Sequence, residues 1–366
     1  MGALTNEQIS VVGGGVAGLA AARALALRGA NVVLYEQADE IAEVGAGLQI
    51  SPNGRVVLTA LGLDITPVSR SARAVVLTDG LTARPVLTMD LAQAAGPYAF
   101  LHRARLIEVL HEGAKGAGVE IRLGSRHEAG AGLTVAADGV HSTHRAALNG
   151  DGAAQFSGQV AWRALILDDG EDDAARVFMG PGRHLVTYRL GAGLRNIVAV
   201  EERSEWAAEG WHETGDPAGL RAAFATFSGP VPGWLEAVQT VHLWGLFLHP
   251  VARRWHNDQT VLIGDAAHPT LPFLAQGANL ALEDAWVLAE CLDQACDATG
   301  LAAFQSRRRD RAIKIVAAAA ANARNYHLRP PIRGLAHTAL RLASRLRPDA
   351  PMRRFDWLYS YDATTQ

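Results

Sequence analysis

The sequence predicts an α/β fold: a Rossmann-like domain with a βαβ start, interleaved with a sheet-based domain and followed by a C-terminal helical segment. The first observation behind this prediction is a glycine-rich turn that joins an apolar run to an alanine-rich helix near the N-terminus. The second is the alternation of apolar and polar residues within 156–255, and the third is the helical composition after residue 300. With 366 residues, 49% of them hydrophobic, the chain has room for two cores.

The composition gives no sign of nucleic-acid or membrane partners. A net charge of −3 and a pI near 6.5 do not suggest the basic patch that nucleic-acid binding needs. Met1–Ser10 has no signal-peptide pattern, and no run of about 18 strongly apolar residues occurs. The two cysteines, Cys291 and Cys296, match neither a redox pair nor a zinc knuckle. We therefore expect a cytoplasmic protein without a metal site.

The segment from residue 9 to residue 35 reads as strand, tight turn, helix and strand. Gly13 allows the tight turn, Gly15 leaves room for the backbone to approach a pyrophosphate, and Gly18 lets helix and strand pack closely. Glu36 stands 18 residues past Gly18, where a carboxylate can accept hydrogen bonds from ribose hydroxyls. The unit predicts a dinucleotide site without distinguishing NAD from FAD. Its predicted ligands are Gly13, Gly15, Val16, Ala17, Gly18 and Glu36.

A later glycine–aspartate turn favours FAD. Thr260–Ile263 forms a buried strand that ends at Gly264 and Asp265, and the glycine lets the chain turn so that the aspartate can reach a polyol such as ribitol. Enzymes that bind only nicotinamide dinucleotides have no ribitol to hold. Gln276–Asn279 then opens a helix through about residue 296, whose N-terminal N–H groups could stabilise an anionic reduced flavin. An ordinary turn and an N-cap at Asn279 would also account for this block taken alone.

Together with Asp138–Ser142, these segments indicate one extended FAD, and at them the chain resembles the class A flavoprotein aromatic hydroxylases. The resemblance is to the salicylate hydroxylase and 6-hydroxynicotinate 3-monooxygenase branch of the p-hydroxybenzoate hydroxylase fold. It is carried by Gly45–Gly47, Ser51–Asn53, Leu101–Leu106, Ala137–Ser142, Arg145, Gln159–Arg163, Gly264–Pro272, Gln276–Ala285 and Asp356–Tyr359. Ala275 departs from the pattern, because many relatives have glycine there.

The resemblance implies a role for each matching residue. By this resemblance Glu36 binds the adenosine ribose, and Ala46 and Gly47 form the loop beside the flavin. Arg103 lies near the pyrophosphate and the ribityl chain, and Asp265 binds ribitol. Asp138 and Gly139 share a role in binding FAD and NAD(P)H, and Pro272 lies by the flavin C4a edge. The remaining implied FAD residues are Gly264, Gly277, Ala278 and Asn279. The implied reaction is hydroxylation of a small phenolic, hydroxybenzoate or hydroxypyridine ring with NADH or NADPH and O2, through a C4a-hydroperoxyflavin.

A hydroxylated ring becomes more reactive when a base takes or shares its hydroxyl proton. His184 and Tyr188 are four residues apart on an expected strand, face the same side, and are candidates for such a base or relay. Pro272 is the third candidate catalytic residue. His268 is an alternative base, although a lone histidine is more often structural, and Arg163 could contact a carboxylate or pair with an acid of the protein.

We expect three parts in the chain. The FAD-binding domain is discontinuous and comprises 1–73, 99–155 and 256–300. The substrate domain comprises 74–98 and 156–255, where aromatic residues could roof a ring pocket, although they are more often ordinary core. The C-terminal helical segment comprises 301–366 and begins with a helix whose arginines at 307–311 are expected on the outside.

Residues 332–346 of that segment form a basic amphipathic stretch. We expect it to pack on a neighbouring subunit of a homodimer or on the FAD-binding domain. Contact with a membrane would instead fit a hydroxylase of a lipid-borne ring, as in the ubiquinone pathway. A non-hydroxylating FAD oxidase or dehydrogenase is the second alternative, and the proline-rich turn at 269–272 favours the hydroxylase.

Overall fold

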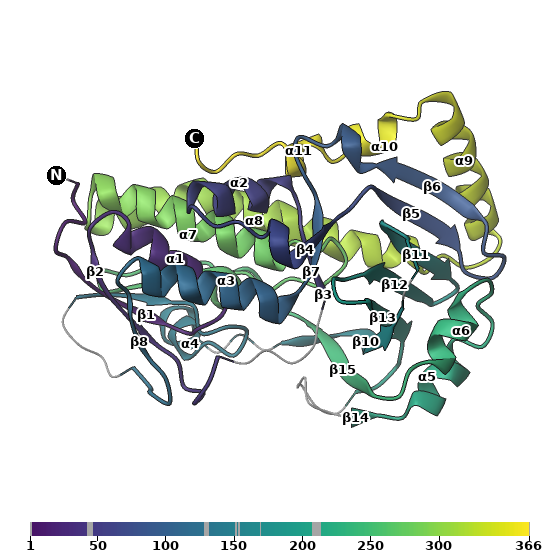
Figure 1. Cartoon of the computed structure of the whole chain (residues 1–366), viewed down its shortest axis with the longest axis horizontal. Coiled ribbons are helices and arrows are strands. Elements are labelled where there is room, and N and C mark those ends of the chain that lie inside the picture. The colour runs from purple at the N-terminus through teal and green to yellow at the C-terminus, as the bar shows by residue number, and fades with distance from the viewer. Residues whose placement is uncertain are drawn as a thin grey trace.

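The computed structural model describes residues 2–41, 47–127, 132–150, 152, 154–168, 170–206 and 214–365. It has two main parts, with helices packed on a parallel sheet in one and a large mixed sheet in the other, and a long C-terminal helix lies against both (Figure 1). The predicted α/β fold is confirmed.

A five-stranded parallel sheet forms the centre of the first part, in the order β16-β9-β1-β2-β8. Its strands are β1 (Gln8–Val12), β2 (Asn31–Tyr35), β8 (Glu120–Arg122), β9 (Leu133–Ala136) and β16 (Thr260–Leu262). Its helices are α1 (Val16–Ala26), α3 (Arg103–Gly116), α4 (Thr143–Asn149) and α7 (Gly277–Gln294). Because α1 is alanine-rich, α3 and α7 approach it closely, and this packing fixes the loop before α1 against the start of α7.

A small three-stranded antiparallel sheet extends this part toward the second one, in the order β3-β7-β4. Its strands are β3 (Gly47–Ile50), β4 (Ser69–Ser71) and β7 (Ala99–His102), accompanied by α2 (Pro52–Ala60). Short 3-10 helices occur at η1 (Thr66–Val68), η2 (Leu91–Gln93) and η3 (Gly264–Ala266). Gly47 donates its N–H to the Asn196 side chain at 3.0 Å, so the small sheet contacts the large one directly.

The second part is an eight-stranded sheet in the order β14-β15-β10-β13-β12-β11-β5-β6, with only the β11–β5 pair parallel. Its strands are β5 (Ala74–Asp79), β6 (Pro85–Asp90), β10 (Gln155–Leu167), β11 (Ala174–Gly180), β12 (Arg183–Arg189), β13 (Leu194–Glu202), β14 (Thr214–Gly215) and β15 (Val241–Leu248). All but the first residue of β10 fall within 74–98 and 156–255. The division into domains itself stays a prediction.

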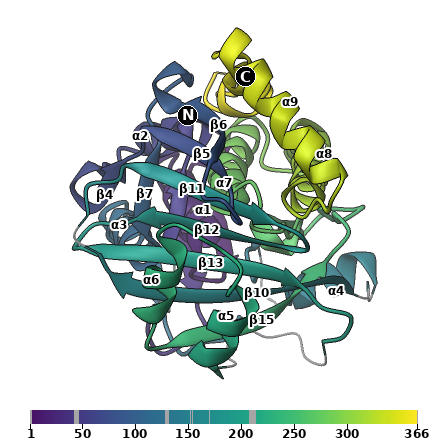
Figure 2. The ribbon, with the colours of Figure 1, turned by 90° about the vertical axis from the view of Figure 1, so that its right-hand side faces the viewer.

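The two faces of the large sheet have different partners. Helices α5 (Pro217–Ala223) and α6 (Val231–Glu236) cover one face (Figure 2), where most of the aromatic residues of this part form an ordinary core. The opposite face carries His184, Val186 and Tyr188 of β12 and turns toward α7 and α8. The buried aromatic residues on the helix-covered face are Trp162, Phe178, Phe224 and Phe227.

The C-terminal segment consists of α8 (Ala298–Tyr326), α9 (Ile332–Leu346), α10 (Ala350–Arg353) and α11 (Asp356–Tyr359). Helix α8 packs along α7, whereas α9 packs on β6, so the predicted packing of 332–346 on the FAD-binding domain is wrong. The outer face of α9 exposes Ile332, Leu335, Leu342 and Leu346. Among the described residues, no helix combines the length and apolarity needed to cross a membrane.

Candidate active site

The loop between β1 and α1 has the geometry expected of a nucleotide-binding turn. Gly13 has φ +107°, and a Cβ there would lie 2.4 Å from the Ala137 carbonyl oxygen. A Cβ on Gly18 would lie 1.9 Å from the Gly13 carbonyl oxygen, so both positions exclude larger residues. In contrast, a Cβ on Gly15 would meet no atom within 4 Å. The loop is therefore rigid, and at Gly15 it opens onto free space, as the fingerprint predicts.

That free space belongs to a cavity between the β1–α1 loop, the small sheet and the start of α7, which we call the nucleotide cavity. Most of the predicted FAD residues come together there, although they span more than 260 positions of the sequence. Ala46 lies outside the described residues. The predicted residues that line the cavity are Gly15, Val16, Ala17, Gly47, Arg103, Gly139, Asp265, Gly277 and Ala278.

Two predicted residues, Glu36 and Asp138, lie beside the cavity without lining it. The Glu36 carboxylate accepts a hydrogen bond from the Gly14 N–H at 2.6 Å, which places an acid beside the fingerprint loop. The Asp138 carboxylate bonds His144 Nδ1 at 2.8 Å, while its Oδ1 atom is buried and has no hydrogen-bond partner in the described structure. Burial would raise the pKa of Asp138, but hydrogen bonds from His144 and Ser142 hold it below its ordinary value.

Gly264 and Asp265 form the predicted turn at the end of β16. Gly264 has φ +58°, and a Cβ there would lie 2.8 Å from the Ala17 Cβ, so the turn packs tightly on α1. Asp265 is accessible from the cavity and makes no hydrogen bond with the described residues. Desolvation by the surrounding protein raises the pKa of Asp265 above its ordinary value, and electrostatic interactions with His268 and Arg103 oppose that effect. A carboxylate that faces a cavity and has no hydrogen bond within the described residues suits a ligand with hydroxyl groups.

Helix α7 presents its N-terminus to the same cavity. Its first backbone hydrogen bond runs from the Leu280 N–H to the Gln276 carbonyl at 2.8 Å, so the preceding N–H groups of residues 277–279 have no helical partner. The Asn279 side chain is fully buried instead of facing the cavity. Its Oδ1 accepts from the Ser51 N–H at 3.0 Å, and its Nδ2 donates to the Gln49 carbonyl at 3.1 Å. Only the backbone of Asn279 is therefore available to a ligand.

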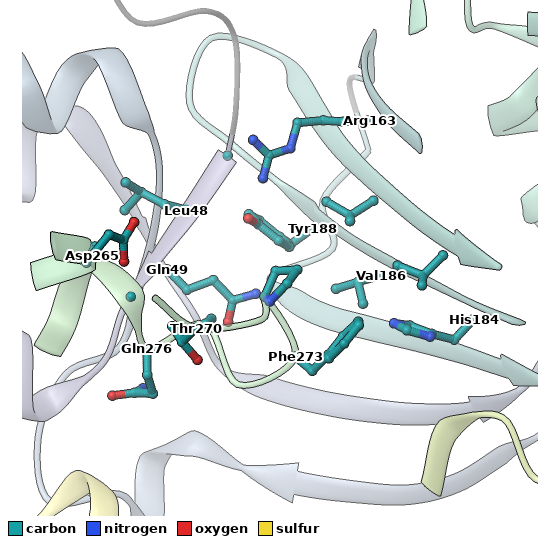
Figure 3. Close-up of a pocket in the computed structure, with 17 residues that line it drawn as sticks. Leu48, Gln49, Arg163, His184, Val186, Tyr188, Asp265, Thr270, Phe273 and Gln276 are labelled. Atoms are coloured by element: carbon teal, nitrogen blue, oxygen red, sulfur yellow. The ribbon is translucent and has the colours of Figure 1, made fainter. Parts of the chain in front are cut away.

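A second cavity adjoins the first and lies under the large sheet (Figure 3). We call it the ring cavity; its volume is about 180 Å³. The two cavities meet at Gly47, Leu48, Arg163, Asp265, Gly277 and Ala278. The ring cavity is further lined by Gln49, His184, Val186, Tyr188, Val198, Val200, Thr270, Pro272, Phe273, Ala275 and Gln276. All three predicted catalytic residues, His184, Tyr188 and Pro272, thus lie around one space.

His184 and Tyr188 share a face of β12, as predicted, but they do not form a pair. Val186 stands between them (Figure 3), and each has its own hydrogen-bonding partners. His184 Nδ1 lies 2.7 Å from His327 Nε2, whereas Tyr188 bonds Gln49. Burial, reinforced by His327, lowers the pKa of His184 far below its ordinary value, and burial raises that of Tyr188 despite Arg163 and Gln49. Both side chains are therefore neutral near pH 7.

The sequence did not reveal a buried charge cluster behind α7. Arg308 is fully buried and pairs with Glu283 at 2.7 Å and with Asp284 at 2.8 Å. Arg311 also pairs with Glu283 at 2.8 Å. The prediction that all these arginines lie outside is wrong. His268, the alternative base, bonds Asp284 at 2.5 Å and does not line the ring cavity. A run of arginines in an alanine-rich helix resembles a solvated face, so only the partners on α7 could have shown that Arg308 is buried.

The sequence also did not indicate two further residues of the site, Gln49 and His327. Gln49 stands two residues after Gly47 on β3, so the period of a strand places both on the cavity side. His327 lies just past the end of α8 and reaches β12 from a position 143 residues away along the chain. No local pattern in the sequence indicates that contact.

Ala275, which precedes α7, has φ +54°, a left-handed conformation that glycine adopts without strain. We expect Ala275→Gly to raise the free energy of unfolding by up to about 1 kcal/mol, because the relieved strain exceeds the added entropy of the unfolded chain. Denaturant unfolding measures the change. Ala147→Gly, in the exposed part of α4, is the control and should cost about 1 kcal/mol. A loss at both positions would contradict the expectation.

Comparisons with known proteins define the class. The family model for the FAD binding domain matches residues 88–319. The chain is 33% identical to 3-amino-4-hydroxybenzoate 2-monooxygenase of Streptomyces platensis, over 98% of this chain and 97% of that protein. It is 30% identical to 3-hydroxybenzoate 6-hydroxylase of Klebsiella oxytoca, over 87% and 88% of the two chains. The crystal structure of Klebsiella pneumoniae HpxO with FAD and uric acid shares the fold, with a TM-score of 0.83, 24% identity, and coverage of 96% and 97%.

The chain belongs to the FAD-dependent aromatic hydroxylases of class A. The protein is accordingly an FAD-dependent monooxygenase, and the predicted family, cofactor and enzyme class are confirmed. The structure also fits FAD on its own terms, because the open space at Gly15 and the Asp265 carboxylate lie at the same cavity.

Proposed function

We propose that this enzyme hydroxylates a single aromatic ring that carries a hydroxyl group, of the hydroxybenzoate type, with O2 and NADH or NADPH. The observation that carries the proposal is the ring cavity, which adjoins the nucleotide cavity and has a volume of about 180 Å³. A protein cavity of roughly 150 Å³ accommodates benzene, so this space suits one ring with small substituents. The names of the two curated relatives, both enzymes of hydroxylated benzoates, support the same class.

The residues of the nucleotide cavity would hold FAD, which supplies the activation of O2 once it is reduced. In this proposal the β1–α1 loop receives the pyrophosphate, Arg103 contributes positive charge beside it, and Asp265 accepts hydrogen bonds from ribitol. The N–H groups at the start of α7 stabilise negative charge on the reduced ring. Asp138 and Gly139 would take part in binding both FAD and NAD(P)H.

Three side chains of the ring cavity divide the work on the substrate. Arg163 of β10 borders both cavities, and its positive charge would attract a substrate carboxylate. His184 would accept the proton of the substrate hydroxyl group through its Nε2 atom. Pro272 lines the same cavity and would exclude water from the reacting atoms.

The test is a spectrum followed by an assay. Purified enzyme should be yellow, and hydroxybenzoates and aminohydroxybenzoates should stimulate oxidation of NADH or NADPH. Mass spectrometry under ¹⁸O2 should show one labelled oxygen atom in the product. Stimulated oxidation that yields only hydrogen peroxide with every ring would favour a non-hydroxylating flavoprotein. Turnover only with rings that carry long apolar tails would favour a hydroxylase of lipid-borne substrates.

A further inference from the structure

His184 belongs to a chain of side chains that reaches from the ring cavity to the protein surface. His184 Nδ1 lies 2.7 Å from His327 Nε2, and His327 Nδ1 lies 3.1 Å from Glu202 Oε1. His184 and His327 are 0% and 4% exposed, whereas the Glu202 side chain is 38% exposed. The chain of contacts therefore begins at a cavity wall and ends in contact with water.

Three elements hold these residues in line. His184 of β12 pairs with Val200 of β13, and Glu202 stands two residues farther on β13, on the same face of the sheet. His327 follows α8, and its carbonyl accepts a hydrogen bond from the Gly182 N–H at 3.2 Å. Gly182 in turn accepts from the Glu202 N–H at 2.9 Å, so the backbone fixes the spacing of the last two groups.

The inner end of this chain of contacts, His184 Nε2, has no hydrogen-bond partner in the described part of the protein. This nitrogen is buried, although the ring of His184 lines the ring cavity. The rings of Phe273 and Tyr326 pack against it at centroid distances of 5.3 and 5.1 Å and contribute no partner to this nitrogen. An unpaired buried nitrogen is costly, which indicates that a ligand satisfies it.

We propose that His184, His327 and Glu202 form a proton relay that carries the hydroxyl proton of the substrate to the surface. The proposal rests on the proposed function, because it needs a ring with an ionisable hydroxyl group. The substrate O–H bond breaks as a bond forms to His184 Nε2. His184 Nδ1 gives its proton to His327 Nε2, His327 Nδ1 gives its proton to Glu202 Oε1, and Glu202 releases a proton to water. The same transfers in the reverse order protonate the product and restore the starting tautomers of both imidazoles.

The charges around the relay suit these transfers. Burial lowers the pKa of His327, the hydrogen bond to Glu202 opposes this, and the charges of Arg329 and Arg183 reinforce it, so the imidazole is neutral near pH 7. Burial would raise the pKa of Glu202, but hydrogen bonds from Arg329 and His327 keep it below its ordinary value. The outer end is thus an ionised acceptor.

Gln159 supports the state that follows the transfer. Its side-chain Nε2 lies 3.3 Å from His327 Nδ1. Once His327 Nδ1 has given up its proton, this amide can donate a hydrogen bond to it. The starting and final tautomers of His327 therefore both have a partner.

The experiment follows ionisation of a bound phenol rather than turnover. A nitro-substituted hydroxybenzoate is mixed with holoenzyme without NAD(P)H, and the absorbance of its phenolate is recorded by stopped flow. Because positioned proton transfer contributes about 100-fold or more, His327→Gln and Glu202→Gln should each slow the ionisation step by at least about tenfold. Imidazole in the buffer should restore the rate in Glu202→Gln, which a purely structural role would not predict.

His337→Gln is the matched control. His337 is also buried, 3% exposed, and its Nδ1 lies 3.1 Å from the Asp79 carboxylate, but it is not part of the relay. Its variant should ionise the phenol at the wild-type rate. Wild-type rates in both His327→Gln and Glu202→Gln, or equal slowing by His337→Gln, would overturn the relay while leaving the proposed function intact. Wild-type holoenzyme that binds none of the phenols would overturn the proposed substrate class and the relay with it.

Discussion

Gly15→Val should yield a folded protein that is colourless. A Cβ at residue 15 meets no atom within 4 Å, so the backbone there has room for the start of a side chain. The branched side chain would fill the space where the β1–α1 loop faces the nucleotide cavity, and the phosphates could no longer approach the backbone N–H groups. The loss of several phosphate hydrogen bonds, each worth about 1.5 to 3 kcal/mol, predicts at least about a 100-fold weaker affinity for FAD.

Titration of apoprotein with FAD, followed by fluorescence, measures that affinity, and circular dichroism checks the fold. Gly116→Val is the matched control, because a Cβ at the end of α3 also meets no atom within 4 Å but faces no cavity of the site. The control should remain yellow with unchanged affinity. If Gly15→Val binds FAD as tightly as Gly116→Val does, the pyrophosphate does not lie at the β1–α1 loop.

The difference between local and distant contacts explains how much of this site the sequence could predict. Gly13, Gly15 and Gly18 lie within one turn and the helix that follows it, and the structure agrees with the prediction at each. At Gly13 and Gly18 nearby backbone atoms exclude a side chain, whereas Gly15 is restricted only by the space that it leaves open. The turn at Gly264 and Asp265 and the start of α7 were also predictable, because they too depend on local backbone geometry. The eight-stranded sheet was predicted as strands, but its order depends on pairings between distant residues.

Polar groups in the core were the least predictable. Arginine is usually a surface residue, and only the fold brings Arg308 against two carboxylates of α7. Asn279 was expected at the cofactor or as an N-cap, yet its side chain joins α7 to the strand and loop at residues 49–51. In both cases the sequence shows a polar residue but not the distant partner that removes it from water.

Arg308→Met should destabilise the protein more than Arg307→Met does. Glu283 and Asp284 are both 0% exposed. Methionine would leave Asp284 buried without the guanidinium that it contacts, while Glu283 would keep only its second cationic partner, Arg311. Removing one partner of a buried ion pair costs about 3 to 5 kcal/mol, because the remaining charge stays desolvated. Since Glu283 also bonds Asn53, which contacts Gln276 at the ring cavity, the affinity for FAD should fall as well.

Arg307→Met provides the comparison on the neighbouring residue. Arg307 pairs with Glu290 on the surface, where both side chains are about a quarter exposed, at 26% and 27%. Such exposed pairs contribute about 0 to 1 kcal/mol, so urea unfolding should separate the two variants by at least about 2 kcal/mol. Equal losses in the two variants would show that the cluster behind α7 is no more important for stability than a surface ion pair.

The same cluster predicts how stability depends on pH. Burial would raise the pKa of Asp284, but His268 and Arg308 lower it to about 2, below the ordinary value of 3.8. Because the pKa is lower in the folded state, the stabilisation is present above about pH 4 and is lost as the pH falls toward 2. In Arg308→Met the pKa of Asp284 should rise, so acid unfolding should begin at a higher pH than in wild type, whereas Arg307→Met should unfold at the wild-type pH. An unchanged acid midpoint in Arg308→Met would mean that His268 alone keeps Asp284 ionised.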